Sequence, residues 1–166
     1  MKRALRFFLS TQVAAAALSL SSCETGGVSQ GIQQARLETA ARIQSEAPGD
    51  YYVGRRYFKR NYKFWGYIRR PGQPWSTSKL VMLNEKEKLA PDRAQASFGS
   101  DSNYEYKLYG NFSGDTVYEP ASNGFYPEFN LKNYELISTN PAPIFKSQYN
   151  GRSQAAVGAM TIEKPE

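Results

Sequence analysis

The stretch YKFWGYIRRPGQPWSTSKLVML, residues 62–83, carries the pattern from which the fold can be inferred. Two sets of residues alternate along 61–69: Tyr62, Phe64, Gly66 and Ile68 in one, Lys63, Trp65, Tyr67 and Arg69 in the other. This period of two predicts a strand. Pro71-Gly72 suits the centre of a type II turn, because proline presets φ at the first position and glycine accepts a positive φ at the second. The apolar run within residues 79–83 then predicts a second, central strand.

Later segments repeat the strand signal. Residues 104–109 alternate between apolar and polar side chains, and Ser113-Gly114-Asp115 predicts the turn of a hairpin that returns along residues 116–118. A last strand begins at Phe129, and its apolar phase slips at Asn133, which predicts a bulge or bend. Helix formers over residues 31–46 predict a short helix that Pro48-Gly49 ends. The predicted fold is mainly β: a small antiparallel barrel or sandwich of about six strands, preceded by this helix.

The first residues of the chain read as a signal peptide. Residues 1–6 carry Lys2, Arg3 and Arg6 with no acidic residue, and an apolar block follows over residues 7–20. Three polar residues interrupt the block, and it is shorter than the roughly 20 apolar residues that span a bilayer. The segment therefore predicts export and not a permanent transmembrane anchor.

Leu20-Ser21-Ser22-Cys23 follows this block directly and contains the single cysteine of the chain. The four residues resemble the lipobox of bacterial lipoproteins. The resemblance implies that the Cys23 sulfur receives a diacylglycerol, that cleavage occurs just before Cys23, and that acyl chains hold the mature protein on a membrane. Family members kept in the inner membrane often carry Asp after the cysteine. Glu24 stands there in this chain, so the resemblance implies the outer membrane, facing the periplasm.

The expected organisation has four parts. They are a signal peptide over 1–22, a lipid-anchored tether with the short helix over 23–49, a β domain over 50–146, and a flexible tail over 147–166. Whether the helix packs on the β domain is left open by the sequence. The tether predicts that the domain stands off the membrane.

Charge is segregated along the chain. Residues 51–84 contain eight basic residues and no acid, whereas residues 101–135 contain six acids and two lysines. Two explanations remain: strands of the two halves pair so that opposite charges face one another, or the basic half forms a surface for an anionic partner. The chain without its signal peptide has 18 basic and 15 acidic residues. This small excess gives no support for nucleic acid as a partner.

The candidate ligand site is the basic and aromatic segment around residues 65–75. Trp65, Tyr67 and Arg69 share one strand face, and planar rings beside guanidinium groups suit anionic glycans or lipid headgroups. The candidate residues are Trp65, Tyr67, Arg69, Arg70, Trp75, Arg55 and Arg56. The alternative is that the rings form the covered second face of the sheet, with an arginine stacked on a tryptophan for stability.

Catalytic equipment is scarce in the sequence. There is no histidine, which removes the commonest general base and metal ligand, and Cys23 is assigned to lipid. We therefore predict no catalytic residue, no metal and no cofactor, and a structural or binding role in the envelope. Partners would be the membrane through the lipid and an anionic envelope polymer or another envelope protein. The alternative is a lipid-anchored glycan hydrolase with paired carboxylates, for which the candidates are Asp50, Asp92, Asp101 and Asp115.

Overall fold

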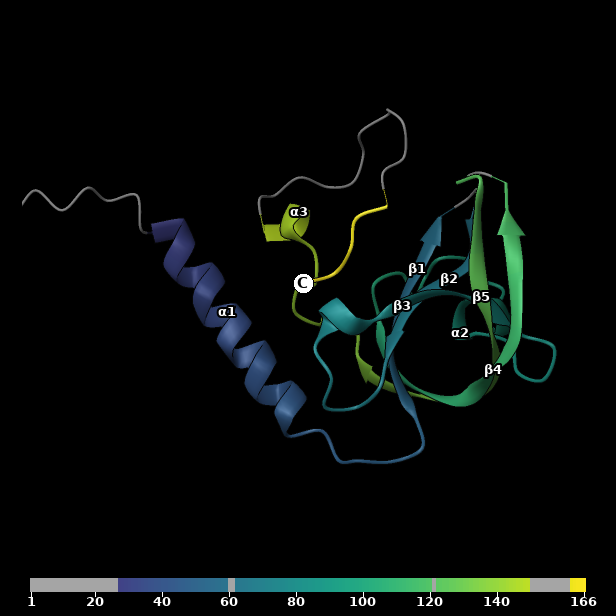
Figure 1. Ribbon diagram of the computed structural model, residues 1–166, viewed down its shortest axis with the longest axis horizontal. Coiled ribbons are helices and arrows are strands. Elements are labelled where there is room, and N and C mark those ends of the chain that lie inside the picture. Colours follow the sequence, from purple (N-terminus) through teal and green to yellow (C-terminus); the bar gives the residue numbers. More distant parts are fainter. Residues whose placement is uncertain (1–26, 60–61, 121, 150–161) are drawn as a thin grey trace, which may run out of the picture.

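The structure is a computed structural model that describes residues 27–59, 62–120, 122–149 and 162–166. The predicted signal peptide and Cys23 lie outside the described residues. The elements are α1 (Gly27–Gln44), β1 (Tyr52–Lys59), β2 (Tyr62–Arg69), the 3-10 helix η1 (Trp75–Thr77), β3 (Lys79–Asn84), α2 (Pro91–Ala94), β4 (Glu105–Glu119), β5 (Gly124–Ser138) and α3 (Lys146–Tyr149). Helix α1 lies beside the strands, as Figure 1 shows.

The strands close into a barrel in the order β1-β2-β3-β5-β4. This confirms the predicted mainly β barrel preceded by a helix. Five strands are described where about six were expected, and β3 and β5 run parallel, with Leu83 opposite Phe129. All other neighbouring pairs are antiparallel. The parallel pair is possible because residues 85–104 and β4 separate the two strands along the chain.

Each of the five strands contributes to one interior core. Its buried members are Tyr52, Ile68, Val81, Leu83, Ala90, Tyr106, Leu108, Phe129 and Leu131. Aromatic rings pack edge to face within it, for example Tyr52 against Phe129 at 5.1 Å between centroids. Glycine is required where strands approach closely: a Cβ at Gly110 would lie 2.0 Å from the carbonyl oxygen of Asn130. The barrel is therefore filled by side chains.

Strands β4 and β5 form one long hairpin, and this corrects the turn predicted at Ser113-Gly114-Asp115. Those residues lie inside β4, where the pairing register shifts between Phe112 and Thr116, so they form an irregularity and not a turn. The chain reverses only after Glu119, and β5 begins at Gly124. The irregularity predicted near Asn133 is present, because Tyr109 pairs with Asn133 whereas Gly110 pairs with Leu131.

A second core covers the outer face of β1 and β2. Its buried members are Ile43, Tyr51, Val53, Tyr67, Trp75, Ile144 and Phe145, which come from α1, the two strands, η1 and the segment after β5. Among the α1 side chains that the structure describes, Ile43 near the end of the helix is buried, whereas Leu37 is 66% exposed. The helix thus contacts the barrel at its last turns, which answers a question that the sequence leaves open.

The last described residues, 162–166, pack on the domain, whereas residues 150–161 of the tail expected over 147–166 lie outside the described residues. The Glu166 N–H donates to the carbonyl of Ile144 at 2.9 Å, and the Tyr67 hydroxyl donates to the carbonyl of Glu163 at 2.8 Å. Ile162 packs against the second core, and Pro165 is buried. The sequence 162–166 is too short for a periodic pattern, which is why this packing is not visible from composition.

Candidate functional site: buried arginines and a groove beside the helix

Arg55 lies on the outer face of β1 but is fully covered. Its Nε and Nη2 donate to Glu105 Oε2 at 3.1 and 2.8 Å, Nη1 donates to Asn103 Oδ1 at 3.1 Å, and Nη2 also donates to the Ala142 carbonyl at 2.9 Å. Arg55 and Glu105 are opposite one another in the β1–β4 pairing. The N–H donors of the guanidinium are therefore hydrogen-bonded to acceptors within the protein.

Arg69 is held in the same way at the edge of the second core. Its Nη1 and Nη2 donate to the two Glu46 carboxylate oxygens at 2.7 and 2.6 Å, a bidentate pair. Glu46 Oε2 also accepts the Gly72 N–H, so one carboxylate joins the end of α1 to the turn after β2. The Trp75 ring contacts both guanidinium groups, with Arg55 at 5.3 Å and Arg69 at 4.6 Å from the ring centroid.

Arg56 points into the barrel, where it meets three carboxylates. Nη2 donates to Asp92 Oδ1 at 2.7 Å, Nε donates to Asp101 Oδ2 at 3.2 Å, and Nη1 lies 3.6 Å from Glu85 Oε1. Arg93 adds a second cation, 3.3 Å from Glu85 Oε2. The cluster closes the end of the barrel beside α2.

Burial dominates the acid-base behaviour of this cluster. Loss of solvent raises the pKa of Glu85 and that of Asp101, although the Arg56 charge opposes both shifts. The pKa of Tyr106 is also raised, by burial first and then by the Asp101 charge. On the outer face, burial raises the pKa of Tyr57 to about 12. In all four side chains, loss of contact with water disfavours the charged form.

The described candidates do not form the exposed basic and aromatic patch expected from the sequence. Five of its candidates are buried: Arg55, Arg56, Arg69, Tyr67 and Trp75. The side chain of Trp65 lies outside the described part of the structure. Arg70 is the remaining candidate; its side chain is 50% exposed, pairs with Asp50 and lies over the Tyr52 ring. The physical reason is that carboxylates from other segments pair with the arginines. Arg55 and Glu105 face one another across paired strands, as the alternative of facing charges predicts, whereas the partners of Arg56 and Arg69 lie outside the strands.

The carboxylates named for a hydrolase do not line a common cleft. Asp92 and Asp101 are buried around Arg56, whereas the Asp50 side chain is almost fully exposed and Asp115 is exposed within β4. Among the described residues, no group of three or more metal-binding side chains is placed to hold a metal ion. The described helices also include none that is long and apolar enough to cross a membrane.

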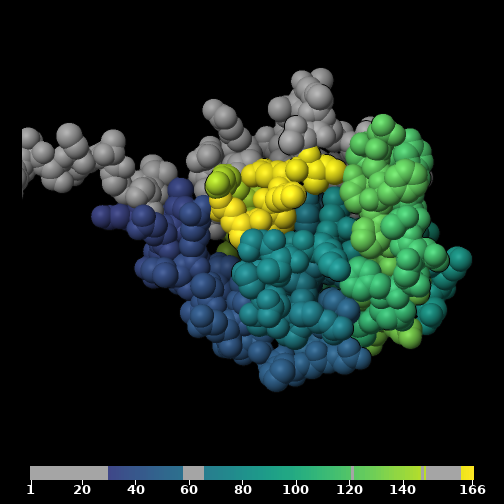
Figure 2. Space-filling model, in the orientation of Figure 1, coloured from purple at the N-terminus to yellow at the C-terminus, as the bar shows by residue number. Residues whose placement is uncertain are grey.

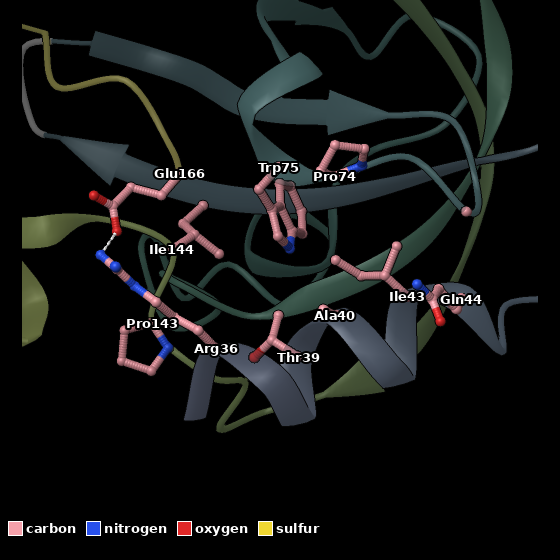
Figure 3. A pocket seen from close by; sticks show the side chains of 11 residues that line it. Arg36, Thr39, Ala40, Ile43, Gln44, Pro74, Trp75, Pro143, Ile144 and Glu166 are labelled. Atoms are coloured by element: carbon pink, nitrogen blue, oxygen red, sulfur yellow. Dashed lines mark hydrogen bonds and ion pairs between the residues drawn. The ribbon is translucent and has the colours of Figure 1, made fainter. Parts of the chain in front are cut away.

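An open groove of about 610 Å³ lies between α1 and the barrel. Figure 3 shows Trp75 and Pro74 on the barrel side and Thr39 and Ala40 on the helix side. The full lining consists of Arg36, Thr39, Ala40, Ile43, Gln44, Gly72, Pro74, Trp75, Pro143, Ile144 and Glu166. The volume falls within the range of sites for small molecules or short segments.

The groove has an apolar middle and a charged end. Trp75, Ile43 and Ile144 are buried members of the second core that also face this space. At one end Arg36 forms an ion pair with Glu166 (Figure 3). Glu166 Oε1 also lies 3.3 Å from Lys146 Nζ. An occupant would thus find apolar contacts in the middle and charged groups at this end.

Sequence reasoning named only one residue of this groove as a ligand contact, Trp75. The signal for the helix wall was present, because Ile32, Ala40 and Ile43 fall near one side of the predicted helix. The opposite wall joins η1, residues 143–144 and Glu166, which lie far apart in sequence. A single sequence holds no pattern that brings these segments together.

Comparison with protein-family models, curated proteins and solved structures finds no match to this chain.

Proposed function

We propose that this chain is a lipid-anchored protein of the bacterial envelope with a non-enzymatic binding role, held on the outer membrane through Cys23 and facing the periplasm. The observation that carries the proposal is the motif Leu20-Ser21-Ser22-Cys23 directly after a basic and then apolar leader. Two or three acyl chains bury enough methylene groups, at about 0.8 kcal/mol each, to make such anchoring stable.

The position of α1 supports a role for residues 23–49 as a tether. The helix begins at Gly27, four residues after Cys23, and its 18 residues extend about 27 Å at 1.5 Å per residue. Only its end is buried on the barrel, at Ile43. The helix thus joins the lipidated end of the chain to the folded domain.

The groove supports binding of an apolar segment of another envelope protein. Trp75, Ile43 and Ile144 offer an apolar contact surface, and Arg36, Glu166 and Lys146 offer charges of both signs at one end. An anionic polymer is favoured less, because the arginines expected to bind it are paired with carboxylates. Peptide binding commonly combines apolar anchors with a few charged contacts at the rim.

Acylation is tested by metabolic labelling with a clickable fatty acid. Wild-type protein should be labelled, and Cys23→Ala should not. Ser22→Ala keeps a small residue before the cysteine and is the matched control, which should retain the label. Equal labelling of wild type and Cys23→Ala would refute the anchor.

The groove is tested by placing a photo-crosslinking amino acid at Ala40 or at Ala41 in intact cells. Both positions are exposed on α1, but only Ala40 lines the groove. We expect a discrete adduct from Ala40 alone, which mass spectrometry identifies as an envelope protein crosslinked through an apolar segment. Equal adducts from both positions, or an Ala40 adduct with glycan only, would refute the proposal for the groove.

A further inference from the structure

The end of the β4–β5 hairpin extends beyond the barrel. Among the described residues, 116–119 of β4 pair only with 124–127 of β5, whereas β5 pairs with β3 from Glu128 to Asn130 and β4 pairs with β1 from Glu105 to Leu108. Figure 1 shows the hairpin continuing past the other strands, and Figure 2 shows its end as a protrusion at the upper right. We call the described residues 116–120 and 122–127 the hairpin tip.

Two aromatic side chains stand exposed on this tip. Tyr118 and Phe125 are directly opposite in the pairing, with ring centroids 5.1 Å apart, and they are 48% and 70% exposed. The Tyr118 hydroxyl donates to Asn123 Oδ1 at 3.0 Å, and the Tyr126 hydroxyl donates to Ser122 Oγ at 2.7 Å. These hydrogen bonds hold the residues around the two rings in place. The rest of the domain does not cover the Tyr118 and Phe125 rings, which remain in contact with water.

The hairpin tip exposes almost no charge. Glu119 is the one charged residue in 116–127, and it is only 4% exposed. Its Oε2 accepts hydrogen bonds from the Ser122 N–H and hydroxyl at 2.7 and 2.8 Å. Within residues 116–127 the rings have no exposed charge beside them, and the exposed Asp115 lies just before this segment on the barrel side. Such a segment suits an environment where charged groups are costly, such as the upper part of a bilayer.

The hairpin tip and the start of α1 lie toward the same edge of the molecule, the upper edge in Figure 1. Cys23 precedes α1 by four residues, which span at most about 14 Å when extended. A bilayer that holds Cys23 would therefore lie near the first turn of α1 and on the side of the hairpin tip.

We propose that the hairpin tip is a second membrane contact, in which Tyr118 and Phe125 enter the interfacial region of the bilayer that holds the lipid. The inference rests on the proposed anchor for its geometry. Tyr118 suits this region because its ring is apolar while its hydroxyl can still reach water, and the Phe125 ring adds apolar surface that the bilayer would bury. Together the lipid and the hairpin tip would fix the orientation of the barrel on the membrane.

The experiment uses acylated protein purified from cells and reconstituted into vesicles of phosphatidylcholine and phosphatidylglycerol. Two variants each add one indole, Phe125→Trp on the hairpin tip and Phe98→Trp in the loop after α2; Phe98 is 67% exposed, so the two positions are matched. Both retain the native Trp65 and Trp75, whose emission is common to the pair. Emission is compared in vesicles with and without bromine on the upper acyl chain, and near-UV circular dichroism checks that both variants are folded.

We expect blue-shifted emission and quenching by bromine for Phe125→Trp, and neither for Phe98→Trp. Equal quenching of both variants would overturn the proposal, and so would a blue shift without quenching, because the ring would then lie against protein or a second copy. The mass of the same samples separates the two proposals. An acylated protein with an unquenched tip refutes the second contact alone, and a quenched tip on an unacylated protein refutes the anchor alone.

Discussion

Replacing Glu105 with leucine should destabilise the fold strongly, because it leaves the Arg55 guanidinium buried without its carboxylate. The side chains of Arg55 and Glu105 are 0% and 4% exposed, and two charge-assisted hydrogen bonds join them. Removing one partner of such a pair costs about 3–5 kcal/mol. For a β domain over residues 50–146 that corresponds to a fall in Tm of about 12–40 °C. The remaining contacts of Arg55 with Asn103 and Ala142 are neutral acceptors and compensate only in part.

Urea unfolding followed by circular dichroism measures this cost. Glu135→Leu is the matched control: its carboxylate also faces a cation across the β4–β5 pairing, Lys107 at 3.7 Å, but its side chain is 59% exposed. That variant should change the unfolding free energy by about 1 kcal/mol or less. The double variant Arg55→Leu, Glu105→Leu should be more stable than Glu105→Leu alone, because no unpaired charge remains. The reasoning would be refuted if Glu105→Leu lowered the unfolding free energy no more than Glu135→Leu does. It would also be refuted if the loss in the double variant equalled the sum of the losses in Arg55→Leu and Glu105→Leu.

Three further expectations concern the core. The pKa of Glu85 and that of Asp101 are raised, so the native state keeps protons that the unfolded chain loses above about pH 4. The unfolding free energy should therefore fall as pH rises from about 4 through the raised pKa values. Urea unfolding repeated from pH 4 to 8 should show a smaller fall for the double variant Glu85→Gln, Asp101→Asn than for the wild type. An unchanged slope would contradict the burial argument. Gly110→Ala should lower the unfolding free energy by about 3 kcal/mol, because the new Cβ clashes with a backbone carbonyl. Gly31→Ala, in open space on α1, should raise the unfolding free energy by about 0.5–1 kcal/mol. Similar urea midpoints for the two variants would contradict this expectation. Trp75→Ala should cost about 3–5 kcal/mol in the same assay and remove near-UV ellipticity, and a cost under about 1 kcal/mol would show that the ring is not part of the core.

Local patterns predicted the local structure well. The alternation over 61–69 corresponds to β2, and Gly72 has φ of +74° with a turn hydrogen bond from Gln73 to Arg70, as the turn prediction requires. The phase slip at Asn133 marks a real shift in pairing. Each of these depends on residues within one turn or strand, where sterics act over a few positions.

Long-range features were not accessible in this way. The prediction of a turn at Ser113-Gly114-Asp115 was wrong because glycine with positive φ serves a strand irregularity as well as a turn; Gly114 has φ of +95° inside β4. The burial of the arginines depends on partners such as Glu105, which lies 50 residues from Arg55. Charge segregation indicated that such pairing was available, but it did not say which arginine would meet which acid.

Intact mass spectrometry of the protein isolated from its native membrane tests the central claim most directly. The account predicts a mature chain that begins at Cys23 and carries the added mass of a diacylglycerol, with or without a further acyl chain on its new amino terminus. The modification should be absent from Cys23→Ala. A mature chain with an unmodified amino terminus at any other residue would contradict the account.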